Sequence, residues 1–300
     1  MKNFKKLFVA IDFSPASDEA LRQAHDRAVS TAADLAVCHV VPNELRSNLL
    51  FPQDTHYAAL RFPMEMKQIG EAAAKRVADI TGRTDREFEL IIDDGTPQAL
   101  ILSLAEEWHA DLIIVGSKGQ TGAGDLLLGS VADSIIRHAH CPVLVVRAGN
   151  QTQRIVAGTD FSDSALPALR AAASEAERTG AKLTVVHSLD LVWSAASYPV
   201  MAFGGMPFNI STEEISKLNV EATQRIEAAL KKLNSTGEAV VTTGAAGTAI
   251  LQIAAERAAD LIVVGTVGRT GLRRALLGSV AEMVVERAEC SVMIVRQHPG

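Results

Sequence analysis

Short, nearly continuous apolar runs alternate along this chain with longer segments in which apolar residues recur every three or four positions. The runs are typical of strands buried on both faces, and the longer pattern is typical of amphipathic helices. The predicted strands are 7–11, 35–41, 88–92, 112–115, 143–146, 155–157, 183–187, 239–242, 261–264 and 292–295. The predicted helices are 16–32, 64–81, 97–109, 129–139, 164–179, 212–234, 246–258 and 278–288. This alternation favours a parallel, doubly wound sheet, whose ligands bind beyond the carboxyl ends of the strands.

The chain contains this pattern twice. Residues 111–147 align with residues 260–296, and 19 of the 37 aligned positions are identical. A repeat of this length is a complete domain and not a solenoid unit. We therefore predict two domains, residues 1–148 and 153–297, joined by a short polar segment. Each is expected to be an α/β domain, a five-stranded parallel sheet with helices on both faces.

Composition and charge narrow the class of protein. Hydrophobic residues make up 48% and charged residues 21%, which excludes a disordered or collagen-like chain. The net charge of −6 leaves no basic surplus for a nucleic-acid backbone, so no nucleic-acid partner is expected. Three cysteines without a CxxC pair support neither a disulfide framework nor a zinc site. The apolar run 7–11 is too short for a signal peptide, and we expect a cytoplasmic protein.

A glycine-rich loop follows the fourth predicted strand of each copy. Both loops have the pattern G-x-x-G-(nine residues)-G-S, in which the last glycine opens a helix. Free amides at a helix N-terminus and the helix dipole favour an anion such as phosphate. The alternative interpretation is a plain helix cap with a flexible lead-in. The motif residues are Gly116, Gly119, Gly129, Ser130 and Val131 in the first copy, and Gly265, Gly268, Gly278, Ser279 and Val280 in the second.

This pattern resembles the nucleotide-binding signature of the universal stress proteins, in the form that carries two such domains on one chain. The resemblance covers nearly all 300 residues, whereas no Walker loop and no GxGxxG after the first strand are present. It implies two Rossmann-like domains, of the adenine nucleotide alpha hydrolase-like kind, that bind ATP, with ADP and AMP as alternatives. Mg²⁺ would accompany the nucleotide through its phosphates, since no protein carboxylate can be assigned to it.

An aspartate ends the first predicted strand of each copy, Asp12 in the first and Asp160 in the second. The resemblance implies that these carboxylates accept hydrogen bonds from the ribose hydroxyls. Helix capping is the alternative for the two aspartates, and we expect Ser14 and Ser162 to be caps. The resemblance also assigns further residues around these strands and loops to the nucleotide site. They are Ala10, Ile11, Lys118, Gly158, Thr159, Val267 and Arg269.

A histidine lies near the end of the second predicted strand of each copy. The resemblance places the adenine beside the next residue, which is Val40 after His39 and Ser188 after His187. Ser188 replaces the family's usual aliphatic residue, which weakens the case for base packing in the second copy. The histidines have the positions of catalytic candidates, but they lie in buried runs, and we interpret them as hydrogen-bonded core residues.

The last predicted strands, 143–146 and 292–295, would be apolar sheet edges if left unpaired. Because the family pairs these edges between protomers, the resemblance implies an intramolecular pseudo-dimer of the two domains, and a homodimer of the whole chain stays open. Cys141 and Cys290, just before these strands, are interpreted as buried small side chains and not as redox groups.

The uncharged segment 191–211 contains prolines and glycines that disfavour a membrane-spanning helix, so no membrane partner is expected. We expect the segment to pack over its own domain or against the other copy. A hydrophobic ligand pocket or partner surface is the alternative.

Three functions from different classes follow. We prefer a nucleotide-binding stress regulator with no catalytic residue, in which ATP occupancy biases contact with a partner protein. The second is a slow ATPase or nucleotidyl transferase, although no activating base can be named beside the loops. The third is a scaffold with degenerate sites that binds a hydrophobic ligand near residues 191–211.

The loop of the second copy is the more basic one, with Arg269, Arg273 and Arg274 against Asp125 in the first copy. Lys118 compensates in part, and solvation of the arginines is the alternative to phosphate contact. We expect Arg269→Ala to weaken triphosphate binding more than monophosphate binding, because AMP lacks the outer phosphates. Calorimetric titration with ATP and AMP measures this difference, and equal losses for both nucleotides would contradict it.

Overall fold

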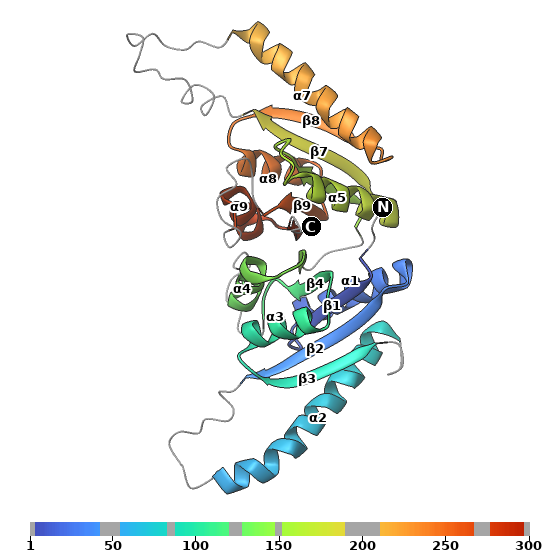
Figure 1. Ribbon diagram of the computed structural model, residues 1–300, viewed down its shortest axis with the longest axis vertical. Coiled ribbons are helices and arrows are strands. Elements are labelled where there is room, and N and C mark those ends of the chain that lie inside the picture. Colours follow the sequence, from blue (N-terminus) through green and yellow to red (C-terminus); the bar gives the residue numbers. More distant parts are fainter. Residues whose placement is uncertain are drawn as a thin grey trace, which may run out of the picture. The chain divides into compact units, whose positions relative to one another are not determined.

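The computed structural model describes residues 4–42, 55–82, 88–119, 128–147, 152–189, 211–266 and 277–296. The chain divides into two compact units, with the division between residues 148 and 149. The first unit contains strands β1 to β5 and the second contains β6 to β10 (Figure 1). Neither the segment between the units nor residues 191–210 of the uncharged segment are among the described residues.

The first unit is built on a parallel sheet in the order β3-β2-β1-β4-β5. Its strands are β1 (Lys6–Ile11), β2 (Asp34–Pro42), β3 (Glu89–Gly95), β4 (Leu112–Gly116) and β5 (Val143–Val146). Its helices are α1 (Pro15–Thr31), α2 (Thr55–Thr81), α3 (Pro97–Glu107) and α4 (Ser130–His138).

The second unit repeats this topology, with the order β8-β7-β6-β9-β10. Its strands are β6 (Arg154–Gly158), β7 (Lys182–Leu189), β8 (Glu238–Thr243), β9 (Leu261–Gly265) and β10 (Ser291–Val295). Its helices are α5 (Leu166–Thr179), α7 (Thr212–Lys232), α8 (Ala246–Glu256) and α9 (Ser279–Arg287). The predicted α/β class, with five parallel strands in each copy, is confirmed.

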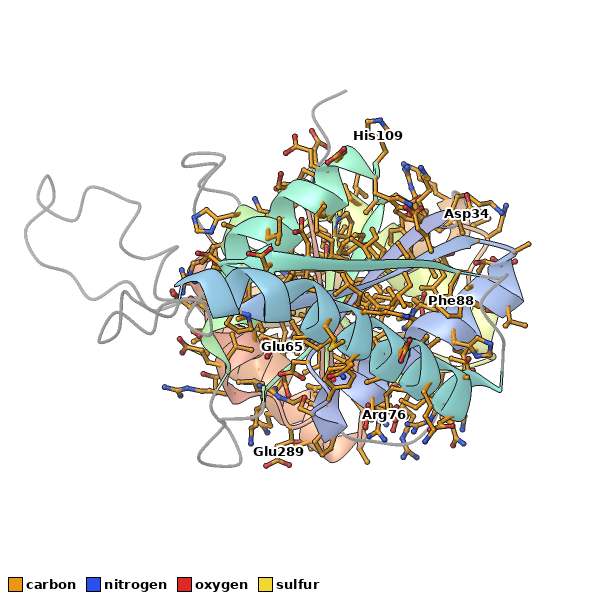
Figure 2. The ribbon with its side chains drawn as sticks, turned by 90° about the horizontal axis from the view of Figure 1, so that it is seen from below. Asp34, Glu65, Arg76, Phe88, His109 and Glu289 are labelled. Atoms are coloured by element: carbon orange, nitrogen blue, oxygen red, sulfur yellow. The ribbon has the colours of Figure 1, made fainter. Side chains whose placement is uncertain are left out.

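Helices cover both faces of these sheets. In the first unit α1 packs against α2, and α3 packs against α4. Gly70 of α2 lies beside Ile92, whereas Gly95 lies beside Leu100 of α3. Because successive side chains of a strand point to opposite faces, residues 92 and 95 show that α2 and α3 lie on opposite faces of β3. In Figure 2, α2 with Glu65 and Arg76 crosses in front of the strands of its unit.

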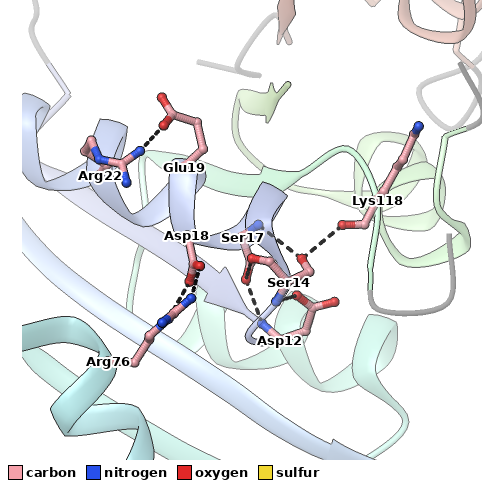
Figure 3. Close-up of polar contacts among 8 residues, drawn as sticks. All are labelled: Asp12, Ser14, Ser17, Asp18, Glu19, Arg22, Arg76 and Lys118. Carbon is pink, nitrogen blue, oxygen red and sulfur yellow. Dashed lines mark hydrogen bonds and ion pairs between the residues drawn. The ribbon is translucent and has the colours of Figure 1, made fainter. Parts of the chain in front are cut away.

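An ion pair anchors α2 to α1 in the first unit. Arg76 binds both carboxylate oxygens of Asp18, with 2.9 Å from Nε to Oδ1 (Figure 3). In the second unit the Arg225 guanidinium of α7 instead lies 5.6 Å from the ring centre of Phe161 and pairs with Glu221 on its own helix. The two outer helices are therefore held by different interactions.

Every helix boundary lies within two residues of the sequence prediction except the N-terminus of α2. α2 begins at Thr55 and not near residue 64. The helix runs through Pro63, although a proline is more often found in the first turn of a helix. α5 begins at Leu166 and not at 164. By contrast, α7 begins as predicted, with a reciprocal pair of hydrogen bonds between Ser211 and Glu214 that also lowers the pKa of Glu214. Within the described ranges, no helix is both long and apolar enough to cross a membrane.

The amino edge of each sheet is closed by an aspartate that precedes the fourth strand of its unit. The Asp111 carboxylate accepts hydrogen bonds from the amides of Lys5 and Lys6, at 2.6 and 3.0 Å. Asp260 accepts the equivalent two bonds from the amides of residues 153–154, both at 3.0 Å. These carboxylates tie the first strand to its neighbour at the point where both begin.

We expect Asp111→Ala to lower the free energy of unfolding of the first unit by about 1 kcal/mol, because two backbone amides lose a charged acceptor and water only partly replaces it. Urea denaturation followed by Trp108 fluorescence, in a Trp193→Phe background, measures the change. Glu107→Ala, at an exposed position of α3, is the control and should leave the midpoint unchanged. Equal midpoints for the two variants would show that the Asp111 bonds do not stabilise the unit.

Candidate functional site

The carboxyl end of β1 continues into a tight turn around Asp12. Asp12 Oδ1 accepts the amide of Ser14 at 3.0 Å, and the Asp12 amide donates to the Ser17 hydroxyl at 3.2 Å (Figure 3). The N-cap of α1 is Ser14, whose hydroxyl accepts the Ser17 amide at 3.2 Å. The predicted cap role of Ser14 is therefore confirmed, and the alternative that Asp12 caps α1 is wrong.

The second unit repeats the turn but not the cap. Asp160 Oδ1 accepts both the amide of Ser162, at 2.9 Å, and its hydroxyl, at 2.5 Å. The prediction that Ser162 caps the next helix is wrong, because α5 begins at Leu166 with Ala165 as its N-cap. Pro15 follows Ser14 directly and starts α1, whereas Pro167 comes later in the second unit and shifts the start of α5. Asp160 does not cap α5 either.

A phenylalanine with positive φ follows each aspartate. Phe13 has φ 63° and Phe161 has φ 62°, in the left-handed region that is unfavourable for a bulky residue. Their rings contact His39 and His187, with ring centres 4.6 and 4.2 Å apart. Both units thus keep the same strained backbone beside the aspartate, and the aromatic contact holds it there.

The two histidines fix the backbone of the first strand. Nδ1 of His39 donates to the carbonyl of Ile11, and Nδ1 of His187 donates to the carbonyl of Thr159, both at 2.8 Å. This confirms the predicted hydrogen bonding of both histidines, of which His187 is buried and His39 is partly buried. It also places Ile11 and Thr159, two predicted site residues, directly before the aspartates in a rigid position.

The glycine-rich loop of the first unit begins against the Asp12 turn. A Cβ on Gly119 would lie 2.7 Å from Asp12 Oδ2, and a Cβ on Gly116 would lie 2.8 Å from the backbone of Ala16. The Ser14 hydroxyl donates to the carbonyl of Lys118 at 3.3 Å (Figure 3). The structure therefore brings three predicted site residues together, Asp12, the backbone of Lys118 and Gly119.

In each unit the glycine-rich loop ends at a helix whose N-cap is a glycine. The N-caps of α4 and α9 are Gly129 and Gly278, and neither helix has a side-chain cap. The Gly129 amide donates to the carbonyl of Ser117 at 2.8 Å, and the Gly278 amide donates to that of Thr266 at 2.7 Å. These bonds hold each helix N-terminus against the strand end.

The first-turn residues of these helices are Ser130 and Val131 in α4, and Ser279 and Val280 in α9. Amides in the first turn have no acceptor within the helix, and an N-cap glycine offers no side chain to accept from them. In the part of the chain that the structure describes, the glycine-rich loop of each unit is thus followed by backbone amides that can donate hydrogen bonds to an anion. Val267, Gly268 and Arg269 lie outside the described residues, and their roles stay predictions.

The ends of the second strands differ between the units. Val40 is buried, and the strand register pairs it with Asp93. The Ser188 hydroxyl donates to the carbonyl of Gly244 at 2.6 Å, and Gly244 has φ 109°. The polar side chain at position 188 therefore fastens its strand to the turn after β8, a role that a valine cannot fill.

Asp93 is a site candidate that the sequence analysis did not include. Burial raises the pKa of the Cys38 thiol to about 12, and the negative charge of the Asp93 carboxylate contributes to this rise. The signal in the sequence is a pair of acidic residues where a strand ends, directly before Gly95. Of the two cysteines before the last strands, Cys141 is buried, as predicted, and Cys290 is only partly so.

Among the residues with described side chains, no group of three or more His, Cys, Asp and Glu could hold a metal ion. The carboxylates at this edge, such as Asp12 and Asp93, come from separate strands.

The contacts of the loop glycines predict their tolerance to substitution. We expect Gly116→Ala to lower the free energy of unfolding by about 2 kcal/mol, because its Cβ meets backbone atoms that cannot move away. Gly119→Ala should cost less than about 1 kcal/mol, because the Asp12 carboxylate can rotate away. Gly70→Ala in α2, whose Cβ would make an ordinary van der Waals contact with Ile92 at 3.9 Å, is the control and should stabilise the protein by about 0.5–1 kcal/mol. Urea denaturation ranks the three, and a different order would contradict the contacts.

Comparison with known proteins shows which family shares this arrangement. The model of the universal stress protein family matches residues 3–147 and again residues 151–296. A universal stress protein of Mycobacterium tuberculosis H37Rv is 28% identical over 300 residues, and the match covers 96% of this chain and 96% of that protein. The crystal structure of a universal stress protein from Archaeoglobus fulgidus DSM 4304 covers 97% of this chain and 96% of its own, with a TM-score of 0.65 and 19% identity.

A second solved universal stress protein from Archaeoglobus fulgidus, in complex with dAMP, covers 49% of this chain and 100% of its own. It is 27% identical, with a TM-score of 0.35. The match of the family model to both units, in the same order and with a relative that matches across both, determines the assignment. The chain belongs to the universal stress protein family.

Proposed function

We propose that each unit binds an adenine nucleotide at the carboxyl edge of its sheet, and that the protein acts as a nucleotide-dependent regulator or interaction module in the stress response. ATP is the ligand we favour, with ADP and AMP as alternatives. The observation that carries the proposal is the position of Asp12: one carboxylate oxygen accepts the Ser14 amide, and the other lies against Gly119 at the start of the loop. The proposal takes residues 1–148 and 153–297 as the two domains.

The parts of the site follow the strand order. The loop after β4 leads to the N-terminus of α4, where first-turn amides and the helix dipole suit the phosphates. Asp12, at the end of the neighbouring β1, accepts the ribose hydroxyls. The base then extends toward β2, where Val40 offers an apolar surface. In the second unit Asp160, Ser279 and Ser188 hold the corresponding positions.

The proposal is for binding and not for catalysis. We assign His39 and His187 a structural role, because each donates Nδ1–H to a backbone carbonyl of the first strand and packs against a phenylalanine ring. Mg²⁺ would be held mainly by the nucleotide phosphates. A slow ATPase is the alternative, and the absence of an assigned nucleophile-activating group is the reason we rank it second.

We expect the wild-type chain to bind two ATP molecules, and Asp12→Ala and Asp160→Ala each to remove one of them. Losing two charge-assisted hydrogen bonds to the ribose hydroxyls should weaken the affected site about a hundredfold, which takes it out of the range that the titration detects. Calorimetric titration gives the affinity and the stoichiometry, and nucleotide extracted from freshly purified protein gives the occupancy. Asp34→Ala, at the exposed opposite end of β2, is the control and should bind as the wild type does.

Three results would decide against parts of this proposal. A wild-type chain that binds no adenine nucleotide would exclude the function itself. Two unchanged sites in the double variant of Asp12 and Asp160 would exclude the ribose role of the aspartates. Multiple-turnover phosphate release that Gly119→Ala abolishes would favour the ATPase alternative.

A further inference from the structure

The two units present different side chains at one equivalent position of the sheet. The register pairs Val40 with Asp93 where β2 and β3 end, and it pairs Ser188 with Thr242 where β7 and β8 end. Both pairs lie next to the carboxyl edge of their unit. A carboxylate in the first unit is therefore replaced by a hydroxyl in the second.

Asp93 shares a face of the sheet with Val40 and Cys38. Side chains alternate along a strand, and paired residues of parallel strands point to the same face. This is the face that α3 covers, because a Cβ on Gly95, two residues after Asp93, would lie 3.2 Å from the Leu100 side chain of that helix. The effect of the Asp93 charge on the buried Cys38 thiol agrees with this orientation.

The same face belongs to the proposed nucleotide site. The helix α4, whose first turn is the proposed phosphate site, packs against α3. The order β3-β2-β1-β4 places Asp12 between the glycine-rich loop on one side and the ends of β2 and β3 on the other. A nucleotide with its phosphates at the loop and its ribose at Asp12 therefore extends its base toward Val40 and Asp93.

The Asp93 carboxylate has an oxygen to offer to such a base. Oδ1 accepts the amide of Asp94 at 2.8 Å, and Oδ2 accepts no hydrogen bond from any other residue that the structure describes. An ionised carboxylate is a strong acceptor for an N–H group and repels a carbonyl oxygen. Adenine carries an amino group at C6, and hypoxanthine carries a carbonyl oxygen there.

The second unit lacks this acceptor. Thr242 is neutral, and the Ser188 hydroxyl beside it is already bonded to the carbonyl of Gly244 at 2.6 Å. A hydroxyl can also donate as well as accept, so it can pair with an amino group or with a carbonyl oxygen. The second unit therefore has no charge at this position with which to distinguish the two bases.

Resting on the proposed nucleotide binding, we propose that Asp93 is a specificity-determining residue of the first unit. Its carboxylate accepts a hydrogen bond from the amino group of the base and selects adenine over hypoxanthine. The second unit accepts both bases, so the two halves of the chain differ in the ligands they admit.

The experiment compares ATP with ITP, which carries hypoxanthine in place of adenine, by calorimetric titration of the full-length chain. In an Asp160→Ala background, which removes the second site, ATP should bind about tenfold or more tightly than ITP. Asp93→Thr, which copies the second unit and suits a strand, should bring this ratio close to one. Asp94→Thr, on the opposite face of β3, is the matched control and should keep the ratio.

The reciprocal variant does not depend on how well Asp93→Thr folds. Thr242→Asp in an Asp12→Ala background, where only the second site remains, should gain a preference for ATP over ITP. Equal binding of ATP and ITP to the first site, or a ratio that survives Asp93→Thr, would overturn the role of Asp93 and leave nucleotide binding standing. No binding of either nucleotide by the wild-type chain would instead remove the proposed function, and this inference with it.

Discussion

A parallel sheet is stable only when helices cover both of its faces, and this constraint determines where polar chemistry can occur in each unit. Residues 7–9 of β1 and 112–115 of β4 are completely or almost completely buried, and all of them are apolar. Because all strands of a sheet run the same way, their carboxyl ends meet at one edge, and every crossover leaves from it. Asp12, the loop glycines and the N-terminus of α4 gather at that edge for this reason.

The two edges of each sheet satisfy their backbone groups in different ways. At the amino edge, Asp111 and Asp260 supply charged acceptors for the amides at the start of the first strand. At the carboxyl edge, α4 and α9 begin at Gly129 and Gly278, which contribute no side-chain acceptor. A capping serine there would satisfy the same amides internally. The glycines therefore leave helix stability unoptimised where an anion can compensate.

Duplication has preserved the backbone of this edge more strictly than its side chains. Phe13 and Phe161 adopt the same unfavourable φ, against histidines that make the same bond to the first strand. The surrounding residues have diverged in charge and in their contacts. Thr242 holds the position in the second unit that Asp93 holds in the first. Arg76 of α2 pairs with Asp18 of α1, whereas Arg225 of α7 contacts the ring of Phe161. A rigid common frame thus carries two sites of different chemistry.

The pattern of apolar positions determined the elements and their order, because burial on one or two faces imposes a period that is visible locally. The repeat and the spacing of the loop glycines likewise placed Gly119 and Gly129 beside the strand and helix ends, since tight turns and helix starts restrict residue type. These features depend on neighbours in the sequence.

Contacts between distant segments were decided only by the tertiary structure. The approach of Gly119 to Asp12, and the pairing of Val40 with Asp93, depend on which strands become neighbours and in which register. The start of α5 at Leu166 in place of a cap at Ser162 depends on which of several turn residues the packed helix selects. The sequence lists the polar groups that can meet, but only the folded sheet determines which of them do, because strand order and register are properties of the whole unit.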